Sequence, residues 1–359
     1  MVLFTICLCL MVNGFPFVVS ETIVDTSFIG DTRTKILTDV TMGSIIPVVT
    51  ETGKISLSID GLGMSSASGI IQVEKSSGAT VRSAFLAAAT TGFTMVQLSD
   101  GDIELDGVGV SWIYETPSSI ASYNYWADVT SIVKSKFDSA LVGRVDYTVT
   151  EVSKSEWVDG VILAVIINDP SQVVDNTVVL LFGAQDVQGD TFAIGLADPI
   201  DTSDPNLVLD FSLGISFSHQ PTGQFSQVDV NGIRLTTSAG GEDDGEASNG
   251  ALLTVGGLDD SNANPSDPYQ TGVIGPYYDD ELYDLLPFVS NGDTTINIVT
   301  LNPSDDDNVF FSALFFGSAR AWVEPGFMIP EYPLGSLMGI AIFIAALVAY
   351  THIKYTLKI

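Results

Sequence analysis

Four oxygen-bearing side chains in one acidic stretch have the spacing that a hard cation needs. Asp260, Asn262 and Asn264 alternate along the chain, and Asp267 follows them. Such alternation lets a loop wrap carboxylate and amide oxygens around an ion, and oxygen donors without His or Cys favour calcium over zinc or copper. The sequence therefore predicts a Ca²⁺ site, although it lacks the Gly and Glu that an EF-hand would place here. A solvated acidic loop with Asx turns is the alternative. Further oxygen ligands are available from Glu242, Asp243, Asp244, Asp279, Asp280, Glu281 and the trio Asp305, Asp306 and Asp307.

Residues suited to covalent or acid-base catalysis are few. His219, beside Ser216 and Ser218, is the one histidine between the two apolar ends of the chain, and neither G-x-S-x-G nor H-E-x-x-H occurs. A lone histidine in a β-rich run is more often a packing or surface residue than a base. Carboxylates are too abundant for a glycosidase pair to be chosen without geometry. The sequence therefore predicts no enzyme.

Aromatic residues offer a second kind of site. Tyr114, Tyr123, Tyr125, Trp126, Tyr277 and Tyr278 would form a sugar-stacking platform if they shared one open face, whereas core packing explains them equally well. Where these side chains lie therefore discriminates a carbohydrate-binding or glycoside-hydrolysing module from a structural protein.

Composition restricts the classes of partner. The 359 residues include 44 Asp plus Glu against 13 Lys plus Arg, which gives a formal net charge of −31. A chain this acidic is repelled by a nucleic acid backbone, so nucleic acid is excluded as a partner. With 46% hydrophobic and 16% charged residues, the chain has ample apolar material for packed cores.

The body of the chain is predicted to be all-β. Runs rich in Val, Ile, Thr and Phe are separated by Gly, Asn, Asp and Ser clusters, and Asp-Gly or Asn-Gly pairs at residues 60–61, 106–107, 231–232 and 291–292 are typical of tight turns. One short helix is expected at Ala127–Phe137. The predicted strands are Lys54–Ile59, Gly69–Glu74, Thr80–Leu86, Phe93–Leu98, Asp102–Val110, Val145–Thr150 and Val161–Ile167.

An internal repeat organises these strands. Four segments of the first half match four of the second in the same order: IELDGVGVS with VDVNGIRLT, ADVTSIV with YDLLPFV, VDYTVTE with TINIVTL, and DGVILAVII with DNVFFSALFF. We therefore expect two related β-sandwich, jelly-roll-like domains, at residues 21–170 and 171–324, the second with an acidic insertion at 238–278. Chance similarity between alternating strands is the alternative.

Both ends of the chain are apolar. The run Val2–Val12 has the length of a signal-peptide h-region, which predicts a signal peptide at 1–20 and a mature chain without Cys7 and Cys9, hence without disulfides. Residues 334–353 are long enough to span a bilayer as a transmembrane helix. Lys354 and Lys358 follow, so the positive-inside tendency places the tail 354–359 in the cytoplasm and the body outside.

The order Pro330, Glu331, Tyr332, Pro333, apolar helix and basic end resembles the tripartite tails of archaeal-type surface proteins with a Pro-Glu-Phe-Pro-like motif. The resemblance covers about the last 30 residues, and Tyr332 replaces the Phe. It implies that a sortase-like membrane protease recognises the tail and exchanges the helix for another anchor. A plain single-pass anchor, with residues 325–333 as a stalk, is the alternative.

Together these features predict a membrane-anchored extracellular structural or adhesive surface protein, calcium-stabilised, whose partners are the membrane and copies of itself or other surface proteins. The alternative is a tethered carbohydrate-binding or glycoside-hydrolysing module.

Overall fold

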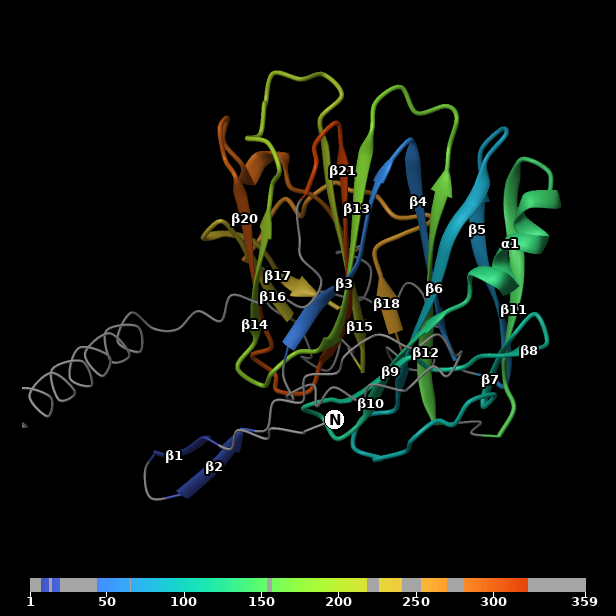
Figure 1. Ribbon diagram of the computed structural model, residues 1–359, viewed down its shortest axis with the longest axis vertical. Coiled ribbons are helices and arrows are strands. Elements are labelled where there is room, and N and C mark those ends of the chain that lie inside the picture. Colours follow the sequence, from blue (N-terminus) through green and yellow to red (C-terminus); the bar gives the residue numbers. More distant parts are fainter. Residues whose placement is uncertain are drawn as a thin grey trace, which may run out of the picture. The chain divides into compact units, whose positions relative to one another are not determined.

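Strands dominate the computed structural model, which describes residues 8–12, 15–19, 44–64, 66–153, 157–217, 226–240, 253–269 and 281–321 (Figure 1). The all-β prediction is confirmed, and the strands form several antiparallel sheets. The chain divides into two units, Met1–Thr38 and Asp39–Ile359. In the first unit, β1 (Leu8–Val12) and β2 (Phe15–Val19) form an antiparallel hairpin. No helix in the described ranges is long and apolar enough to cross a membrane, and the predicted span 334–353 lies outside those ranges.

Four sheets form the described part of the second unit and follow one another from side to side in Figure 1. We call them the first outer, first inner, second inner and second outer sheets. The first inner sheet has the order β4 (Ile55–Gly63), β12 (Val158–Asn168), β6 (Thr80–Thr90), β10 (Tyr123–Asp128) and β9 (Tyr114–Pro117), and the first outer sheet has β5 (Ser68–Lys75), β11 (Gly143–Glu151), β7 (Ile103–Leu105) and β8 (Val108–Gly109).

The second pair of sheets is built in the same way. The second inner sheet has the order β18 (Leu253–Val255), β15 (Val208–Ser216), β21 (Asn308–Gly317), β13 (Asn176–Ala184) and β3 (Ser44–Gly53), with β19 (Leu282–Asp284) also paired to β15, and the second outer sheet has β14 (Asp190–Gly195), β20 (Thr295–Leu301), β16 (Ser226–Val230) and β17 (Ile233–Ala239). Two short helices, α1 (Thr130–Ser139) and η3 (Leu286–Phe288), lie in the connections.

Three apolar clusters hold these layers together. The first lies between the first outer and first inner sheets, and the second lies between the second inner and second outer sheets. The third joins the two inner sheets. The position of β12 between two clusters explains why its sequence is almost continuously apolar. Val161 and Leu163 face the first cluster, while Ile162 and Ala164 face the third. Successive strand residues point to opposite faces, so a strand covered on both faces needs apolar residues throughout.

The strand order of the first half is repeated in the second. The series β4, β12, β6, β10 corresponds to β13, β21, β15, β19, and the series β5, β11, β7, β8 corresponds to β14, β20, β16, β17. Helix α1 follows β10 as η3 follows β19. The segments DGVILAVII and DNVFFSALFF, aligned in sequence, belong to β12 and β21, which occupy the same place in the two inner sheets. Four independent sequence matches thus fall on equivalent elements.

Two local predictions are wrong. The run Phe93–Leu98 is a loop rather than a strand, because the backbone N–H groups of Phe93 and Met95 are bonded to the Ile120 and Ala121 carbonyls, and both residues adopt left-handed φ angles of 62° and 57°. The Asp60-Gly61 pair lies inside β4 rather than at a turn.

The other turn and helix predictions fit better. Asp106-Gly107 and Asn231-Gly232 form hairpin turns with left-handed φ angles at all four residues. The predicted helix begins at Thr130, because Ala127 and Asp128 complete β10. The predicted domain boundary near residue 170 lies in the loop between β12 and β13. Strand β3, however, precedes this boundary by more than a hundred residues and pairs with β13, so it belongs to the sheet of the second half.

Candidate functional site: the loop after strand β18

The acidic stretch that predicted a calcium site forms the loop after β18 and crosses from the second half to the first. It begins at Gly256 and Gly257, where a Cβ atom on Gly257 would lie 2.4 Å from the Ile59 carbonyl oxygen of β4. Glycine permits this close approach because it has no Cβ. One residue later the Leu258 N–H donates to the same Ile59 carbonyl at 2.9 Å. The loop therefore adds a backbone contact to the edge of the first inner sheet.

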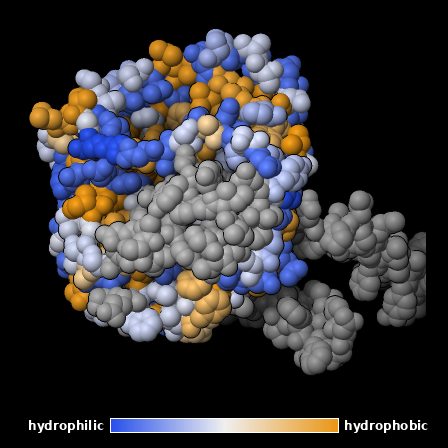
Figure 2. Space-filling view, turned by 180° about the vertical axis from the view of Figure 1, so that it is seen from behind, coloured by the Kyte–Doolittle hydropathy of each residue, from blue (hydrophilic) through white to orange (hydrophobic). Residues whose placement is uncertain are grey.

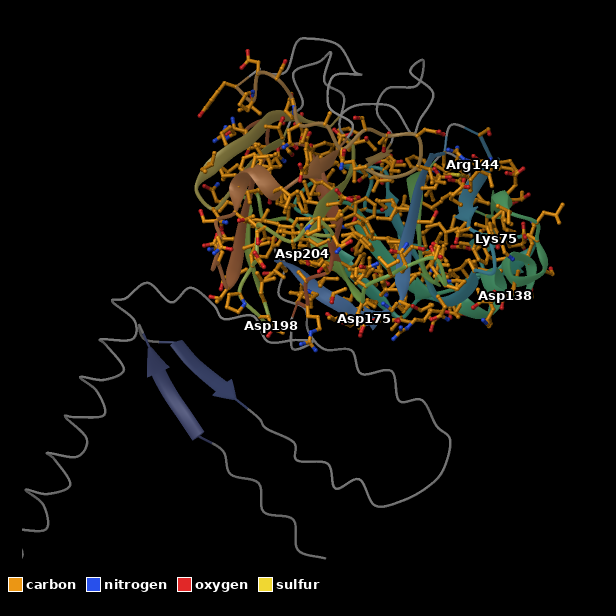
Figure 3. All side chains as sticks on the ribbon, turned by 90° about the horizontal axis from the view of Figure 1, so that it is seen from above. Lys75, Asp138, Arg144, Asp175, Asp198 and Asp204 are labelled. Atoms are coloured by element: carbon orange, nitrogen blue, oxygen red, sulfur yellow. The ribbon has the colours of Figure 1, made fainter. Side chains whose placement is uncertain are left out.

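An ion pair continues this contact. The Arg144 guanidinium, on β11, donates from Nη1 and Nη2 to the two carboxylate oxygens of Asp259 at 2.5 and 2.6 Å. The pairing lowers the pKa of Asp259 and raises that of Arg144. Arg144 lies at the margin of the molecule near β5 (Figure 3), and the Asp259 side chain is 75% exposed, so solvent screens the pair.

A half-buried carboxyl group lies beside this ion pair. Asp60, on β4, accepts a hydrogen bond from the Gln72 N–H at 2.5 Å, and burial raises its pKa to about 6, although Gln72, Gly61 and Arg144 oppose the shift. Asp60 is therefore partly protonated near neutral pH, while Asp259 next to Arg144 is ionised.

The four predicted calcium ligands make separate hydrogen bonds. Asp260 Oδ2 accepts from the Gly257 N–H at 2.6 Å, and Asp267 Oδ1 accepts from the Tyr269 N–H at 3.1 Å. Asn262 Nδ2 donates to Asp210 Oδ1 of β15 at 3.0 Å. Asn264 bonds both the N–H and the carbonyl of Asp284 in β19, at 3.0 and 2.8 Å. Two of the four, Asn262 and Asn264, thus bind the loop to the second inner sheet through their side-chain amides.

Within the ranges that the structure describes, no three or more His, Cys, Asp or Glu side chains lie close enough together to bind a metal ion. Glu281 is buried and accepts from the Gly240 N–H and the Thr254 hydroxyl, both at 2.5 Å. Asp307 is fully buried, accepts from Ser226 Oγ at 2.8 Å, and has a pKa raised well above the usual range by burial. Outside the described residues lie Glu242, Asp243, Asp244, Asp279, Asp280, Ser218, His219, Tyr277 and Tyr278.

The four predicted platform residues that the structure describes do not share one open face. Tyr125 is fully buried in the first cluster against Trp112, whereas its neighbour Trp126 is 2% exposed in the third cluster, stacked on Phe85 at 5.2 Å between ring centroids. Adjacent strand residues face opposite sides, so these two rings cannot share a surface. Tyr123 is partly buried against the first cluster, and Tyr114 is 41% exposed.

Sequence reasoning missed the residues on which the loop rests. Arg144 and Asp210 are 115 and 52 positions away from their loop partners Asp259 and Asn262, and nothing in the local pattern points to either. The Gly256-Gly257 pair is the one local signal, since paired glycines indicate a close backbone approach.

The chain matches no protein-family model, and no curated protein is similar to it. Among solved structures, the crystal structure of the major capsid protein P2 from bacteriophage PM2 aligns with 76% of this chain and 100% of its own length, at 12% identity and a TM-score of 0.20. A TM-score of this size does not establish a common fold.

The loop geometry predicts which loop contact matters most. Gly257→Ala should destabilise the unit by about 1–3 kcal/mol, because its Cβ would collide with rigid backbone. Arg144→Gln should cost less than about 1 kcal/mol, since exposed ion pairs contribute little. Urea denaturation of the two variants beside the parent measures both. A larger loss in Arg144→Gln would show that the ion pair, rather than the backbone approach, holds the loop.

Proposed function

We propose that this chain is a structural building block of a cell surface, made of two related β-sandwich domains of jelly-roll type and held outside the membrane by its C-terminal segment. The observation that carries the proposal is the third apolar cluster. It joins the inner sheets of both halves and makes them one block, which is a requirement of a load-bearing element and not of two independent binding modules.

The nested strand pairing supports the jelly-roll assignment. In the first half the paired strands that lie farthest apart in the sequence are β4 and β12. The pairs β5 with β11, β6 with β10, and β7 with β8 are nested between them in the sequence. In the second half β13 with β21, β14 with β20, β15 with β19, and β16 with β17 repeat the series. Jelly rolls serve as shell-forming, lectin and other domains, so the architecture alone does not select the function.

The arrangement of the aromatic rings favours a structural role over carbohydrate binding. Tyr125 and Trp126 are buried in two different clusters, which removes two of the six predicted aromatic residues from any sugar-stacking surface. On the face shown in Figure 2, the coloured apolar residues are interspersed with hydrophilic ones.

Apolar side chains at one end of the first half are suited to packing against another copy. Phe93 and Met95 are 62% and 60% exposed despite their left-handed backbone, and Trp157, whose carbonyl accepts from the Thr91 N–H at 3.0 Å, is 44% exposed. Left-handed φ is unfavourable for bulky residues, so retaining two of them in exposed positions supports a role in contact.

Self-association should depend on these residues. Replacing Phe93 and Met95 together by Asn, which tolerates left-handed φ, removes the edge-to-face contact of Phe93 with Phe217 but no core residue. The folded double variant should shift assemblies of the full chain toward the monomer in analytical ultracentrifugation. Leu141→Asn, at an 88% exposed position in the turn after α1, is the matched control. An unchanged distribution in the double variant, or an equal shift in the control, would contradict a role for this end in assembly.

The topology of the anchor can be tested in intact cells. External protease should digest the body and leave residues 354–359 protected, because Lys354 and Lys358 favour the cytoplasmic side. Digestion of that tail from outside would overturn the proposed orientation. The mass of the mature protein then separates a retained helix from a tail exchanged by a sortase-like protease at the Pro330–Pro333 motif.

We also propose that Ca²⁺ stabilises the loop after β18, since a divalent cation bound by Asp260 and Asp267 would offset the negative charge of this acidic loop. Calcium should raise the unfolding midpoint of the full chain more than sodium chloride at equal ionic strength, and Asp260→Ala with Asp267→Ala should remove the difference. Equal midpoints in calcium and matched salt would reject a specific site, and an undiminished effect in the double variant would locate it elsewhere.

A further inference from the structure

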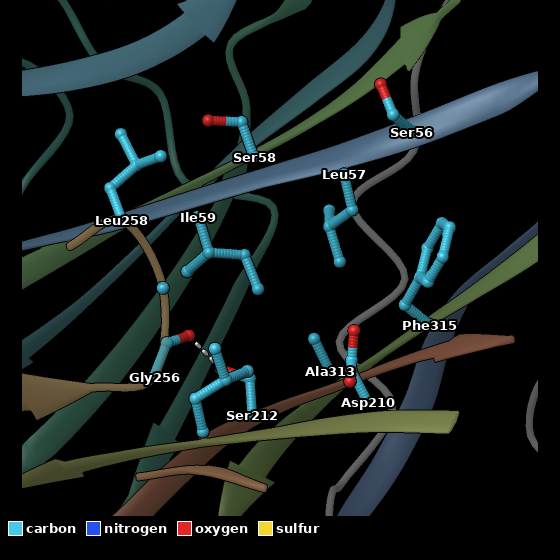
Figure 4. Close-up of a pocket in the computed structure, with 12 residues that line it drawn as sticks. Ser56, Leu57, Ser58, Ile59, Asp210, Ser212, Gly256, Leu258, Ala313 and Phe315 are labelled. Carbon is cyan, nitrogen blue, oxygen red and sulfur yellow. Dashed lines mark hydrogen bonds between the residues drawn. The ribbon is translucent and has the colours of Figure 1, made fainter. Parts of the chain in front are cut away.

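We propose that a slot between the two halves binds a primary alkylammonium group, with Asp210 as its counter-charge. The slot has a volume of about 230 Å³ and lies between β4 on one side and β15 and β21 on the other (Figure 4). Its principal walls are Leu57, Ile59, Leu258, Ala313 and Phe315, with Asp210 at its base. This inference is independent of the structural role proposed above.

The size and the walls select a slender apolar stem. Pockets for drug-sized ligands begin at about 300 Å³, so this slot suits a single aliphatic chain. Two of its three serine hydroxyl groups already make hydrogen bonds: Ser212 donates to the Gly256 carbonyl at 2.5 Å, and Ser58 accepts from the Glu74 N–H at 3.0 Å. A metal ion would need several oxygen ligands, whereas an ammonium group on a hydrocarbon stem needs one carboxylate and apolar walls.

The negative charge of Asp210 and Asp284 favours a cation in the slot. Asp210 stands directly opposite Asp284 in the pairing of β15 with β19, and like charges in that position are destabilising. Neither Lys nor Arg is among the described residues that line the slot. Burial raises the pKa of Asp210, and Asp284 adds to the shift, while the hydrogen bond from Asn262 opposes it. An ammonium group in the slot would neutralise this local excess and favour the ionised carboxylate.

The loop after β18 positions the carboxylate. Asn262 Nδ2 holds Asp210 Oδ1 at 3.0 Å, and Asn264 holds the backbone of Asp284 on the neighbouring strand. The same loop supplies Gly256, Gly257 and Leu258 to the wall of the slot. The alternating Asn residues are thus assigned to orienting an organic-cation site.

The proposal is tested with n-butylammonium chloride and the full chain. Its addition should raise the unfolding midpoint more than ammonium chloride at equal ionic strength and more than n-butanol at equal concentration. Asp210→Asn should abolish the excess shift, and Ala313→Met, which fills the slot without changing its charge, should abolish it as well. Asp198→Asn is the matched control, because this exposed aspartate pairs with Arg320 and lies across the molecule from Arg144 (Figure 3).

Two sources of the alkylammonium group are distinguished by a second ligand. Nα-acetyl-lysine methylamide should reproduce the shift, and its Nε-acetylated form should not, if the natural occupant is a lysine side chain of another protein. A shift with butylammonium but not with the lysine amide identifies a free amine. The proposal is overturned if butylammonium acts no more strongly than ammonium chloride, or if both slot variants keep the full shift.

Discussion

Ile162→Asp is expected to destabilise the whole second unit, and not its first half alone. Ile162 is fully buried in the third cluster, between the two inner sheets. The substitution removes its packing and leaves an unpaired charge there, a combined loss of roughly 4 kcal/mol or more. The free energy of unfolding of a domain is about 5–15 kcal/mol, so one such change removes a large part of the stability.

Circular dichroism and urea denaturation of the full chain measure this loss. Ile233→Asp is the matched control, because Ile233 lies on β17 and is 53% exposed, and it should change stability by roughly 0.5 kcal/mol or less. A variant in which the second half unfolds at the parental midpoint while the first half is lost would contradict a third cluster shared by both halves.

A paired substitution isolates the contact between the halves. A Cβ atom on Gly214 of β15 would lie 2.6 Å from Ile162 Cδ1. Gly214→Ala alone should therefore cost about 1–3 kcal/mol, and Ile162→Val, which removes that Cδ1 atom, should cost about 0.5–1.5 kcal/mol. The double variant should lose less than the sum, since one change makes room for the other.

Raising the pH from about 4 to about 7 should destabilise the protein, and Asp159→Asn should remove much of that dependence. Asp159 is fully buried at the start of β12, where burial raises its pKa to about 7; Glu151 adds to the shift and the Thr91 hydroxyl opposes it. A carboxyl group whose pKa is higher in the folded state stabilises the fold when protonated, and that contribution is lost as the pH rises from about 4 to about 7.

The size of the effect follows from the shift. A difference of one pKa unit corresponds to about 1.4 kcal/mol, so Asp159 accounts for about 4 kcal/mol at most between its fully protonated and fully ionised states. Asp190 contributes in the same direction, because burial raises its pKa to about 7 as well. Asp307, which directly precedes β21 and matches Asp159 in the repeat, has a pKa raised by burial and by Asp306.

Other carboxylates act in the opposite sense at lower pH. The pKa of Asp169 is lowered by hydrogen bonds from Ser171 and Gln172 that outweigh its burial, and the pKa of Asp138 is lowered by Lys134 and the Val81 N–H against the same opposing effect. Their contribution is present above about pH 4 and is lost as the pH falls further. Maximal stability is therefore expected in mildly acidic solution.

Urea denaturation between pH 5 and pH 9 provides the measurement. Asp159→Asn should be more stable than the parent at pH 8 and should show a flatter profile, whereas Asp175→Asn, whose side chain is 60% exposed, should follow the parent. A parental profile that rises from pH 6 to pH 8, or an unchanged slope in Asp159→Asn, would show that this carboxyl group is not the one that titrates.

The amino-acid pattern alone indicated two strands that are covered on both faces, β12 and β21, and the left-handed turns at Asp106-Gly107 and Asn231-Gly232. Continuous apolar sequence has one outcome in a sheet, burial on both faces, and Asp106-Gly107 and Asn231-Gly232 can adopt the required φ angles whatever surrounds them. These properties depend on neighbouring residues, so they can be predicted from the sequence.

Tertiary structure alone decided which surface covers each buried residue and what the acidic loop touches. Tyr125 and Trp126 are adjacent aromatic residues with the same predicted burial, yet they lie in different clusters because a second inner sheet packs over one side of the first. Asn262 and Asn264 have the spacing of cation ligands, but β15 and β19 provide hydrogen-bond partners that a local pattern does not contain. Burial can be read from periodicity, whereas the partner across an interface depends on residues 20 to more than 100 positions away.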